Sequence, residues 1–331
     1  MNARILVVGS SNTDMIIKTE RIPKPGETII GGEFTSAAGG KGANQAVGAA
    51  RAGGDVTLVA RVGQDMFGDK AIAGFIADGI NVDYVVRDRT SPSGVALIFV
   101  GSNGENSIAV ASGANARLTP ADVRKAKSAF REASVLLLQL ETPLDTVQAA
   151  AELAAAAGVR VILNPAPARS LPDKLLRRVY LLTPNESEAE LLTGIAVNNM
   201  ESAAKAASAL LARGVQNVII TMGARGALVE GEDLGQMIPA FKVKAVDTTA
   251  AGDIFNGALA LGLAEGRSLL ESARFASAAA AISVTRMGAQ TSAPTRKEID
   301  RLLAAGNGSV GMIGKKGRPE RRQPTRALLP A

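Results

Sequence analysis

The sequence predicts an α/β protein of three layers, with helices on both faces of a mostly parallel central sheet. Apolar runs of strand length alternate with longer helical stretches, and this alternation is typical of βαβ units with right-handed crossovers. Hydrophobic residues make up 47% of the chain but aromatic residues only 3%, so Ala, Val, Leu and Ile must form the core. That mixture suits parallel strands buried on both faces. The 331 residues suffice for one large domain or two modest ones.

The expected elements occupy residues 1–305, which we assign to one domain. The remainder, 306–331, is punctuated by Gly and Pro and has no core-forming period, so we expect a flexible tail. Strands are expected at 5–9, 56–60, 135–138, 161–163, 180–182 and 218–221, and helices at 43–52, 67–78, 142–157 and 202–212.

Two segments break the βαβ rhythm. Residues 13–36 contain Pro23-Lys24-Pro25-Gly26 between short β-like stretches, and residues 93–111 have the pattern of a hairpin that turns at 102–105. The Asn-Gly pair in that turn is a strong hairpin signal. We expect these extra strands to form a small second sheet, a lid over the main one. The alternative is that the hairpin is only a surface ornament.

The absence of cysteine and histidine narrows the possible chemistry. Without cysteine there is no disulfide, thiolate nucleophile or Cys-based metal site, which agrees with a reducing, cytoplasmic setting. Without histidine the commonest general base and metal ligand are both missing. Catalysis must therefore use carboxylates, lysine, hydroxyls, backbone dipoles or a hard cation bound by oxygen.

The chain carries a net charge of +6, and most of it lies in the tail. Six basic residues and one acidic residue fall within 306–331, so the preceding domain is nearly neutral. We interpret the tail as a solvated end, and expect neither nucleic-acid nor membrane contact. No apolar stretch reaches the ~18 residues that a membrane-spanning helix needs, and residues 1–9 lead straight into a strand without a signal peptide.

A helix with a small-residue start follows Asp247. In the segment 247–258, Ala250, Ala251 and Gly252 open a long apolar helix, so the unpaired N–H groups of its first turn can approach an anion. Asp253 lies in the same turn, where its carboxylate could accept a proton from a substrate hydroxyl. The alternative is that Asp253 only caps the helix.

A glycine cluster precedes an Ala-rich helix at 39–46, with the sequence Gly-Gly-Lys-Gly-Ala-Asn-Gln-Ala. Glycines let the backbone come close to a polyhydroxyl ligand, while Lys41 and Asn44 offer donors and an acceptor for sugar oxygens. The segment is not the phosphate loop of nucleotide hydrolases, because Gly42 stands where that loop has Ser or Thr.

Together, segments 39–46 and 247–253 resemble the paired signatures of the ribokinase (PfkB-type carbohydrate kinase) family, and the resemblance extends over residues 5–303. It implies a ribokinase-like fold and transfer of phosphate from ATP to a sugar, with ribose expected. Asp253 would be the general base beside an anion hole at Ala250, Ala251 and Gly252. It also implies Mg²⁺, K⁺ and a homodimer formed through the lid.

The resemblance assigns further residues to three groups. The sugar-binding residues are Asn12, Asp14, Gly40, Lys41, Gly42, Asn44, Glu141 and Asp253. The nucleotide-binding residues are Asn185, Glu188, Thr221, Gly223, Ala224, Gly226, Gly252 and Ser277, with Asn185 and Glu188 also placing magnesium. The potassium site is expected at Asp247, Thr249, Ser283, Arg286, Gly288 and Ser292, mostly through backbone carbonyls.

Several of these residues also have plain structural interpretations. Asp14 could be a turn residue, Glu141 a charge at the start of a helix, and Asn185 with Glu188 a capping box. Alternative functions also stay open at this point. They are a related kinase acting on deoxyribose, another sugar or a nucleoside, a non-catalytic sugar sensor, and nucleic-acid binding through the tail.

Overall fold

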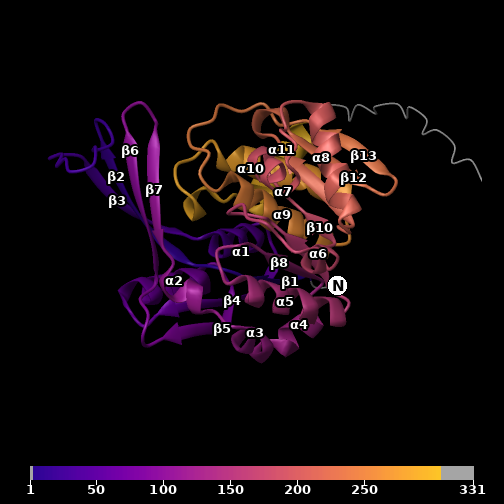
Figure 1. The fold of residues 1–331 in the computed structure, drawn as a ribbon, viewed down its shortest axis with the longest axis horizontal. Helices are drawn as coiled ribbons and strands as arrows, with labels where there is room; N and C mark the ends of the chain where they lie inside the picture. The colour runs from indigo at the N-terminus through magenta and orange to yellow at the C-terminus, as the bar shows by residue number, and fades with distance from the viewer. Residues whose placement is uncertain (1–2, 307–331) are drawn as a thin grey trace, which may run out of the picture.

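The central sheet of the computed structural model has nine strands, and the residues that the structure describes are 3–306 (Figure 1). All neighbouring strands from β10 to β5 are parallel to one another, so the predicted parallel sheet is confirmed. In order across the sheet the strands are β13 (Leu234–Ile238), β12 (Ala227–Gly231), β11 (Asn217–Thr221), β10 (Leu181–Leu182), β9 (Arg160–Leu163), β8 (Val135–Leu138), β1 (Arg4–Val8), β4 (Asp55–Gly63) and β5 (Asn81–Asp88).

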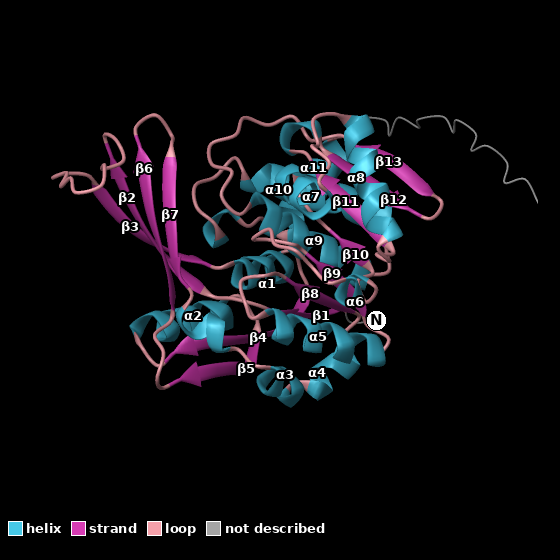
Figure 2. Ribbon diagram, viewed as in Figure 1, coloured by secondary structure: helices cyan, strands magenta, loops and turns pink. Residues whose placement is uncertain are grey.

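Helices cover both faces of this sheet (Figure 2). Alternate residues of β1 point to opposite faces, with Ile5 and Val7 in one apolar core and Leu6 and Val8 in the other. The first core takes its helical residues from α1 (Lys41–Arg51), α2 (Met66–Ala77), α9 (Ala251–Ala264), α10 (Leu269–Ser283) and α11 (Arg296–Ala305). The second takes them from α3 (Pro120–Lys125), α4 (Lys127–Glu132), α5 (Leu144–Ala156), α6 (Asp173–Leu176), α7 (Glu186–Thr193) and α8 (Met200–Ala212). The predicted three layers are therefore confirmed.

One edge of the sheet differs from the expectation. β12 runs antiparallel to both β11 and β13, so a hairpin completes the sheet at this side. The βαβ pattern predicted neither of these strands, and it also missed β5 at the other edge. All three are short or only half-buried, and they lack the continuous apolar run that marks a central parallel strand.

A second sheet of four strands stands beside the main body (Figure 1). Its strands are β3 (Glu33–Gly39), β2 (Asn12–Thr19), β6 (Gly94–Gly101) and β7 (Asn106–Ala111), in that order. β6 and β7 form the predicted hairpin, and Gly104 takes the positive φ that its turn requires. Because β6 also pairs with β2 over eight residues, the hairpin is an integral part of this sheet and not a surface ornament.

No described helix is both long enough and apolar enough to cross a membrane. The expected basic tail lies outside the described residues from position 307 onward.

Candidate active site

Asp253 lies in the first turn of α9, as predicted, but its carboxylate does not cap that helix. The side chain is buried and accepts two hydrogen bonds from the α1 segment, one from Asn44 Nδ2 and one from Gln45 Nε2, each at 3.0 Å. The capping interpretation of Asp253 is therefore wrong. Instead, the segments 39–46 and 247–253 meet at this carboxylate, although they lie more than two hundred positions apart in the sequence.

The small residues before Asp253 shape the start of α9. Ala250 adopts a left-handed conformation with φ 58°, the only non-glycine residue in 3–306 with positive φ. The amide of Ala251 donates to Thr248 O at 3.2 Å, so one of the three amides expected in the anion hole already has a partner. A Cβ added at Gly252 would have no neighbour within 4 Å, so this side of the helix start is open. An anion could approach here with no side chain in its way.

Gly40 and Gly42 serve a purpose that the sequence did not reveal. A Cβ on Gly40 would lie 2.6 Å from the amide of Asn12, and one on Gly42 would lie 2.4 Å from the amide of Ser10. Gly40 also has φ 88°. Here the glycines let the turn pack against the chain that leaves β1, and their expected contact with a ligand stays a prediction.

Glu141 ties this turn to the end of β8. Its carboxylate accepts hydrogen bonds from Ser10 Oγ at 2.5 Å and from the amide of Lys41 at 2.9 Å. Glu141 is therefore not simply a charge at the start of α5. Asn12 is also buried, and its Oδ1 accepts from Asn115 Nδ2 at 2.7 Å. Asn115, in the short helix Gly113–Arg117, was not predicted, because an isolated Asn carries no signal of its partners.

Three carboxylates and one ammonium converge in this part of the structure. Burial raises the pKa of Asp253, against the opposing effects of Lys41, Asn44 and Gln45. Burial also raises the pKa of Asp14 to about 6, helped by the charges of Glu141 and Asp253. Burial would lower the pKa of Lys41, but the charges of the surrounding carboxylates outweigh it and raise that pKa. The site can therefore hold a proton-accepting carboxylate close to a fixed positive charge.

Asp14 lies within strand β2 and not in a turn. Among the described residues no hydrogen bond to its carboxylate forms, which leaves its oxygens open to hydroxyl donors. The pKa of Asp14 is higher in the folded chain than in the unfolded one, so the folded chain holds this proton more tightly. The free energy of unfolding therefore decreases as pH rises from about 4 to about 6. Ionised Asp14 therefore costs stability at neutral pH.

We predict that Asp14→Asn raises the free energy of unfolding at pH 7.5 by up to about 3 kcal/mol, and that the gain vanishes near pH 4. If Asp14 binds the sugar that the resemblance implies, the same change should weaken ribose binding, because a carboxylate acceptor is lost. Denaturant unfolding at the two pH values, with calorimetry of ribose binding, measures both effects. Asp83→Asn, at an exposed carboxylate, is the control. A gain of equal size at both pH values would contradict the assignment.

Most of the predicted nucleotide residues follow the ends of β10 and β11. Asn185 forms an isolated bridge with Thr221, and Asn185 and Glu188 form a complete capping box at the start of α7. The capping interpretation is thus confirmed, while Glu188 is buried and burial raises its pKa. Glycine is required at Gly226, which has φ 101° and lies against Ile238 O. The other predicted members are Gly223 and Ala224 in the short helix Gly223–Arg225, and Ser277, half-buried on α10.

Part of the predicted potassium loop is held together by Asp247. Its Oδ1 accepts from Thr249 N at 2.9 Å and from Thr249 Oγ1 at 2.6 Å, and its Oδ2 accepts from Gly288 N at 2.8 Å. Burial alone would raise the pKa of Asp247, but these hydrogen bonds lower it, so the carboxylate stays charged. Of the remaining predicted members, Ser283 and Ser292 bond to backbone carbonyls of their own turns, and Arg286 pairs with Glu298.

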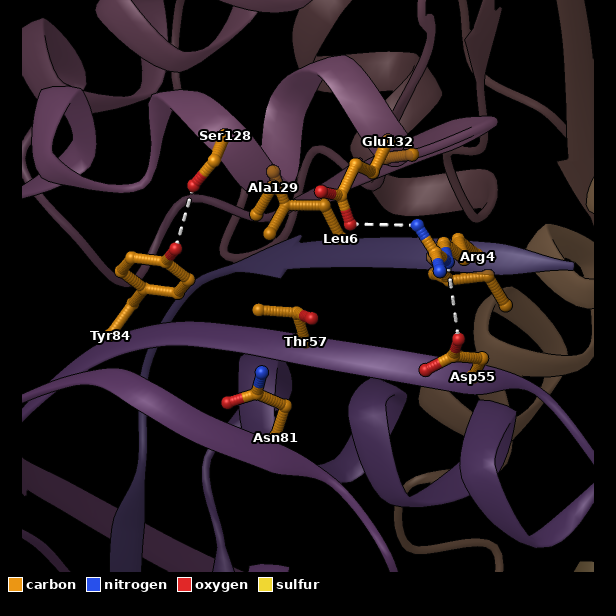
Figure 3. A pocket seen from close by; sticks show the side chains of 11 residues that line it. Arg4, Leu6, Asp55, Thr57, Asn81, Tyr84, Ser128, Ala129 and Glu132 are labelled. Atoms are coloured by element: carbon orange, nitrogen blue, oxygen red, sulfur yellow. Dashed lines mark hydrogen bonds and ion pairs between the residues drawn. The ribbon is translucent and has the colours of Figure 1, made fainter. Parts of the chain in front are cut away.

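A polar pocket of about 220 Å³ lies where β1 and β4 begin, at the opposite end of the strands from the candidate site (Figure 3). Its charged side chains are paired with one another, since Arg4 contacts both Glu132 at 2.7 Å and Asp55 at 3.4 Å. Tyr84 and Ser128 share a hydrogen bond of 2.8 Å across the pocket. None of its described lining residues belongs to the predicted site, so the pocket is not the candidate active site.

Sequence reasoning missed the buried amides beneath Asp253. Gln45 is fully buried and bonds to Asp253, Asn164 and Gln139. Gln45 stands inside the glycine-rich segment, next to Asn44, and this was the available signal. Gln139 and Asn164 follow β8 and β9, where polar residues at strand ends gather at one edge of a parallel sheet.

Known proteins resemble this chain along most of its length. The chain is 46% identical over 303 residues to the ribokinase of Haemophilus influenzae, covering 92% of this chain and 99% of that protein. It is 40% identical over 301 residues to the deoxyribokinase of Salmonella typhi, covering 91% and 98%. The structure of Arabidopsis thaliana ribokinase complexed with ribose and ATP matches with a TM-score of 0.85 at 35% identity, covering 92% and 99%. Residues 2–296 match the pfkB family carbohydrate kinase model, so this chain belongs to the pfkB family of carbohydrate kinases.

Proposed function

We propose that this chain transfers the γ-phosphoryl group of ATP to the 5-hydroxyl of D-ribose, with Asp253 as the general base. The observation that supports this most directly is the Asp253 carboxylate, buried at the open start of α9 and fixed by two amide donors. The proposal also rests on relatives that are named ribokinases.

The proposed transfer moves one proton and one phosphoryl group. Asp253 accepts the proton of the 5-hydroxyl while O5 forms a bond to the γ-phosphorus and the bond from that phosphorus to the bridging oxygen breaks. Ribose 5-phosphate and ADP leave. The developing negative charge would be met by the free amides at the start of α9 and by the helix dipole. Lys41 would supply positive charge near the carboxylates that hold the sugar.

The residues present fit both expected cations. Magnesium prefers oxygen ligands and keeps several waters, so the Glu188 carboxylate, whose pKa is raised by burial and by the charge of Asp253, and the Asn185 side-chain oxygen would suffice to hold it through water. The loop at 283–292 joins the Asp247 carboxylate, and its backbone carbonyls are the ligands that potassium prefers. Magnesium would neutralise phosphate charge, and potassium would stabilise the loop next to the helix start.

The choice between ribose and 2-deoxyribose is the sharpest open alternative, because a deoxyribokinase is almost as similar as the ribokinases. An ADP-release assay over a panel of sugars and nucleosides, with and without potassium, tests the proposal. We expect the highest kcat/KM with ribose and activation by potassium. Higher kcat/KM with deoxyribose would overturn the substrate, and no ADP release with any acceptor would favour a non-catalytic sugar sensor.

We further propose that the four-stranded sheet is a lid, which excludes water from the site and joins two copies of the chain. Cross-strand pairing places Asp14, Ala96 and Val110 on one face, and Ile108 lies on this face as well. Ile108 and Val110 are 55% and 53% exposed, so a second copy could cover them.

The absence of cysteine also supports the proposed cytoplasmic setting, which cell fractionation would test.

The lid proposal predicts that the pair Ile108→Lys and Val110→Lys turns a homodimer into a monomer in light scattering. We also expect the KM for ribose to rise, because Asp14 lies on the same face. Leu97→Lys is the matched control, since Leu97 is 49% exposed on the opposite face of the same sheet. Monomeric wild-type protein, or an unchanged dimer in the double variant, would contradict the proposal.

A further inference from the structure

A continuous chain of buried hydrogen bonds runs beneath the proposed active site. Gln139 Nε2 donates to Gln45 Oε1 at 2.6 Å, and Gln45 Nε2 donates both to Asp253 Oδ1 at 3.0 Å and to Asn164 Oδ1 at 3.1 Å. Gln45 is 0% exposed and Gln139 is 1% exposed. The Gln45 amide therefore uses both of its N–H groups and its oxygen within the protein.

A second branch leads from the same amide to the backbone of α9. Asn164 Nδ2 donates to Thr183 O at 3.2 Å, and Thr183 Oγ1 donates to Asn256 Oδ1 at 2.7 Å. Asn256 Nδ2 then donates to the carbonyl of Gly252 at 2.8 Å. One buried network thus holds the Asp253 carboxylate and also the backbone of the helix turn where the phosphate is proposed to bind.

We propose that Gln45 is a positioning residue for the reaction, which keeps the Asp253 carboxylate oriented and ready to accept a proton. This inference rests on the function proposed above. The direction of the Gln45 amide follows from its two acceptors, because a reversed amide would place its oxygen against the Asp253 carboxylate and against Asn164 Oδ1. Gln139 donates to the oxygen on the other side. Asn44 holds the other carboxylate oxygen from the same helix. The three side chains together leave Asp253 a single orientation.

The charged surroundings of Asp253 show why this donor matters. Lys41 on α1 is the positive group that faces the carboxylate, while Asp14 on β2, Glu141 after β8 and Glu188 on α7 are negative. Burial and like charges favour the protonated acid, and the amide donors oppose that tendency. Loss of the Gln45 donor should therefore protonate Asp253 at a higher pH and let the carboxylate turn away.

The test compares wild type with Gln45→Met and Gln45→Glu, measuring kcat and the KM for ribose from about pH 5.5 to about pH 9. We expect Gln45→Met to lower kcat about ten- to one-hundred-fold at pH 7, with a smaller change in KM, because the misplaced base affects the chemical step. The acid limb of the kcat profile should move to higher pH. It should move further in Gln45→Glu, where two adjacent carboxyl groups cannot both ionise.

Thr146→Val is the matched control for losing a buried hydrogen bond. Thr146 is 0% exposed and donates to Leu118 O at 2.7 Å in the other core. We expect a lower melting temperature in this control with an unchanged kcat and acid limb. If Gln45→Met fails to fold, two other variants take its place in the test. They are Gln139→Met, at a side chain that does not touch Asp253, and the isosteric Gln45→Glu.

The outcomes separate this inference from the proposed function. A wild-type enzyme without turnover on ribose would contradict the function itself. An active wild type, with Gln45 variants whose acid limb superimposes on that of wild type, would contradict the positioning role and leave the function standing. A uniform loss of rate at every pH would also contradict it, because such a loss reports general structural damage.

Discussion

Asp253→Asn should fold normally and lose about 10²- to 10⁴-fold in kcat on ribose, because its amide cannot accept the hydroxyl proton. The substitution keeps the size of the side chain and removes a buried charge. Burial raises the pKa of Asp253 in the folded chain, so its ionisation costs stability at neutral pH. We therefore expect an unchanged or higher free energy of unfolding, measured by denaturant titration alongside ADP release.

Asp145→Asn is the matched control for this substitution. Asp145 occupies the first turn of α5 as Asp253 does in α9, but it is exposed and lies outside the proposed site. We expect its turnover to equal that of wild type. Turnover close to wild type in Asp253→Asn would remove the general base from the proposed mechanism.

Gly252→Ala should make the protein more stable and the enzyme much slower. An added Cβ meets no atom within 4 Å, and replacing an exposed helical glycine by alanine gains about 0.5–1 kcal/mol. The same methyl group would project beside the first-turn amides where the phosphate is proposed to bind. We expect kcat/KM for ATP to fall about 10²-fold, since small misplacements of reacting groups have effects of that size.

Gly74→Ala provides the comparison, because Gly74 is also exposed in a helix, α2, and its added Cβ also meets nothing. Both variants should gain stability in thermal unfolding, and only Gly252→Ala should lose activity. Equal activity in the two variants would mean that no phosphate approaches this turn.

The sequence was most informative where short segments carry special residues. The segments at 39–46 and 247–253 predicted a shared site, and the structure brings Asn44 within 3.0 Å of Asp253. The alternation of strands and helices likewise predicted the layers, because buried parallel strands need apolar runs on both faces.

Other features could not be predicted from local patterns. The order of nine strands depends on which buried strands become neighbours, and parallel apolar strands such as β8 and β9 have similar sequences wherever they lie. The hairpin of β12 and β13 was missed because its strands lack the continuous apolar run of a central strand. The places of Gln45, Gln139 and Asn164 beside a motif or at a strand end indicated polar positions, but not which of these side chains bond to one another. The partners of a buried amide are set by contacts between residues far apart in the chain.

The left-handed conformation of Ala250 makes the proposed phosphate site rigid before any ligand arrives. A non-glycine residue in this conformation costs about 1–2 kcal/mol, a cost that glycine would avoid. The methyl group, however, denies the backbone the many conformations that glycine would explore in the unbound protein. The cost of ordering this corner is therefore met during folding, so under the proposed function an arriving nucleotide would find the amides already in place.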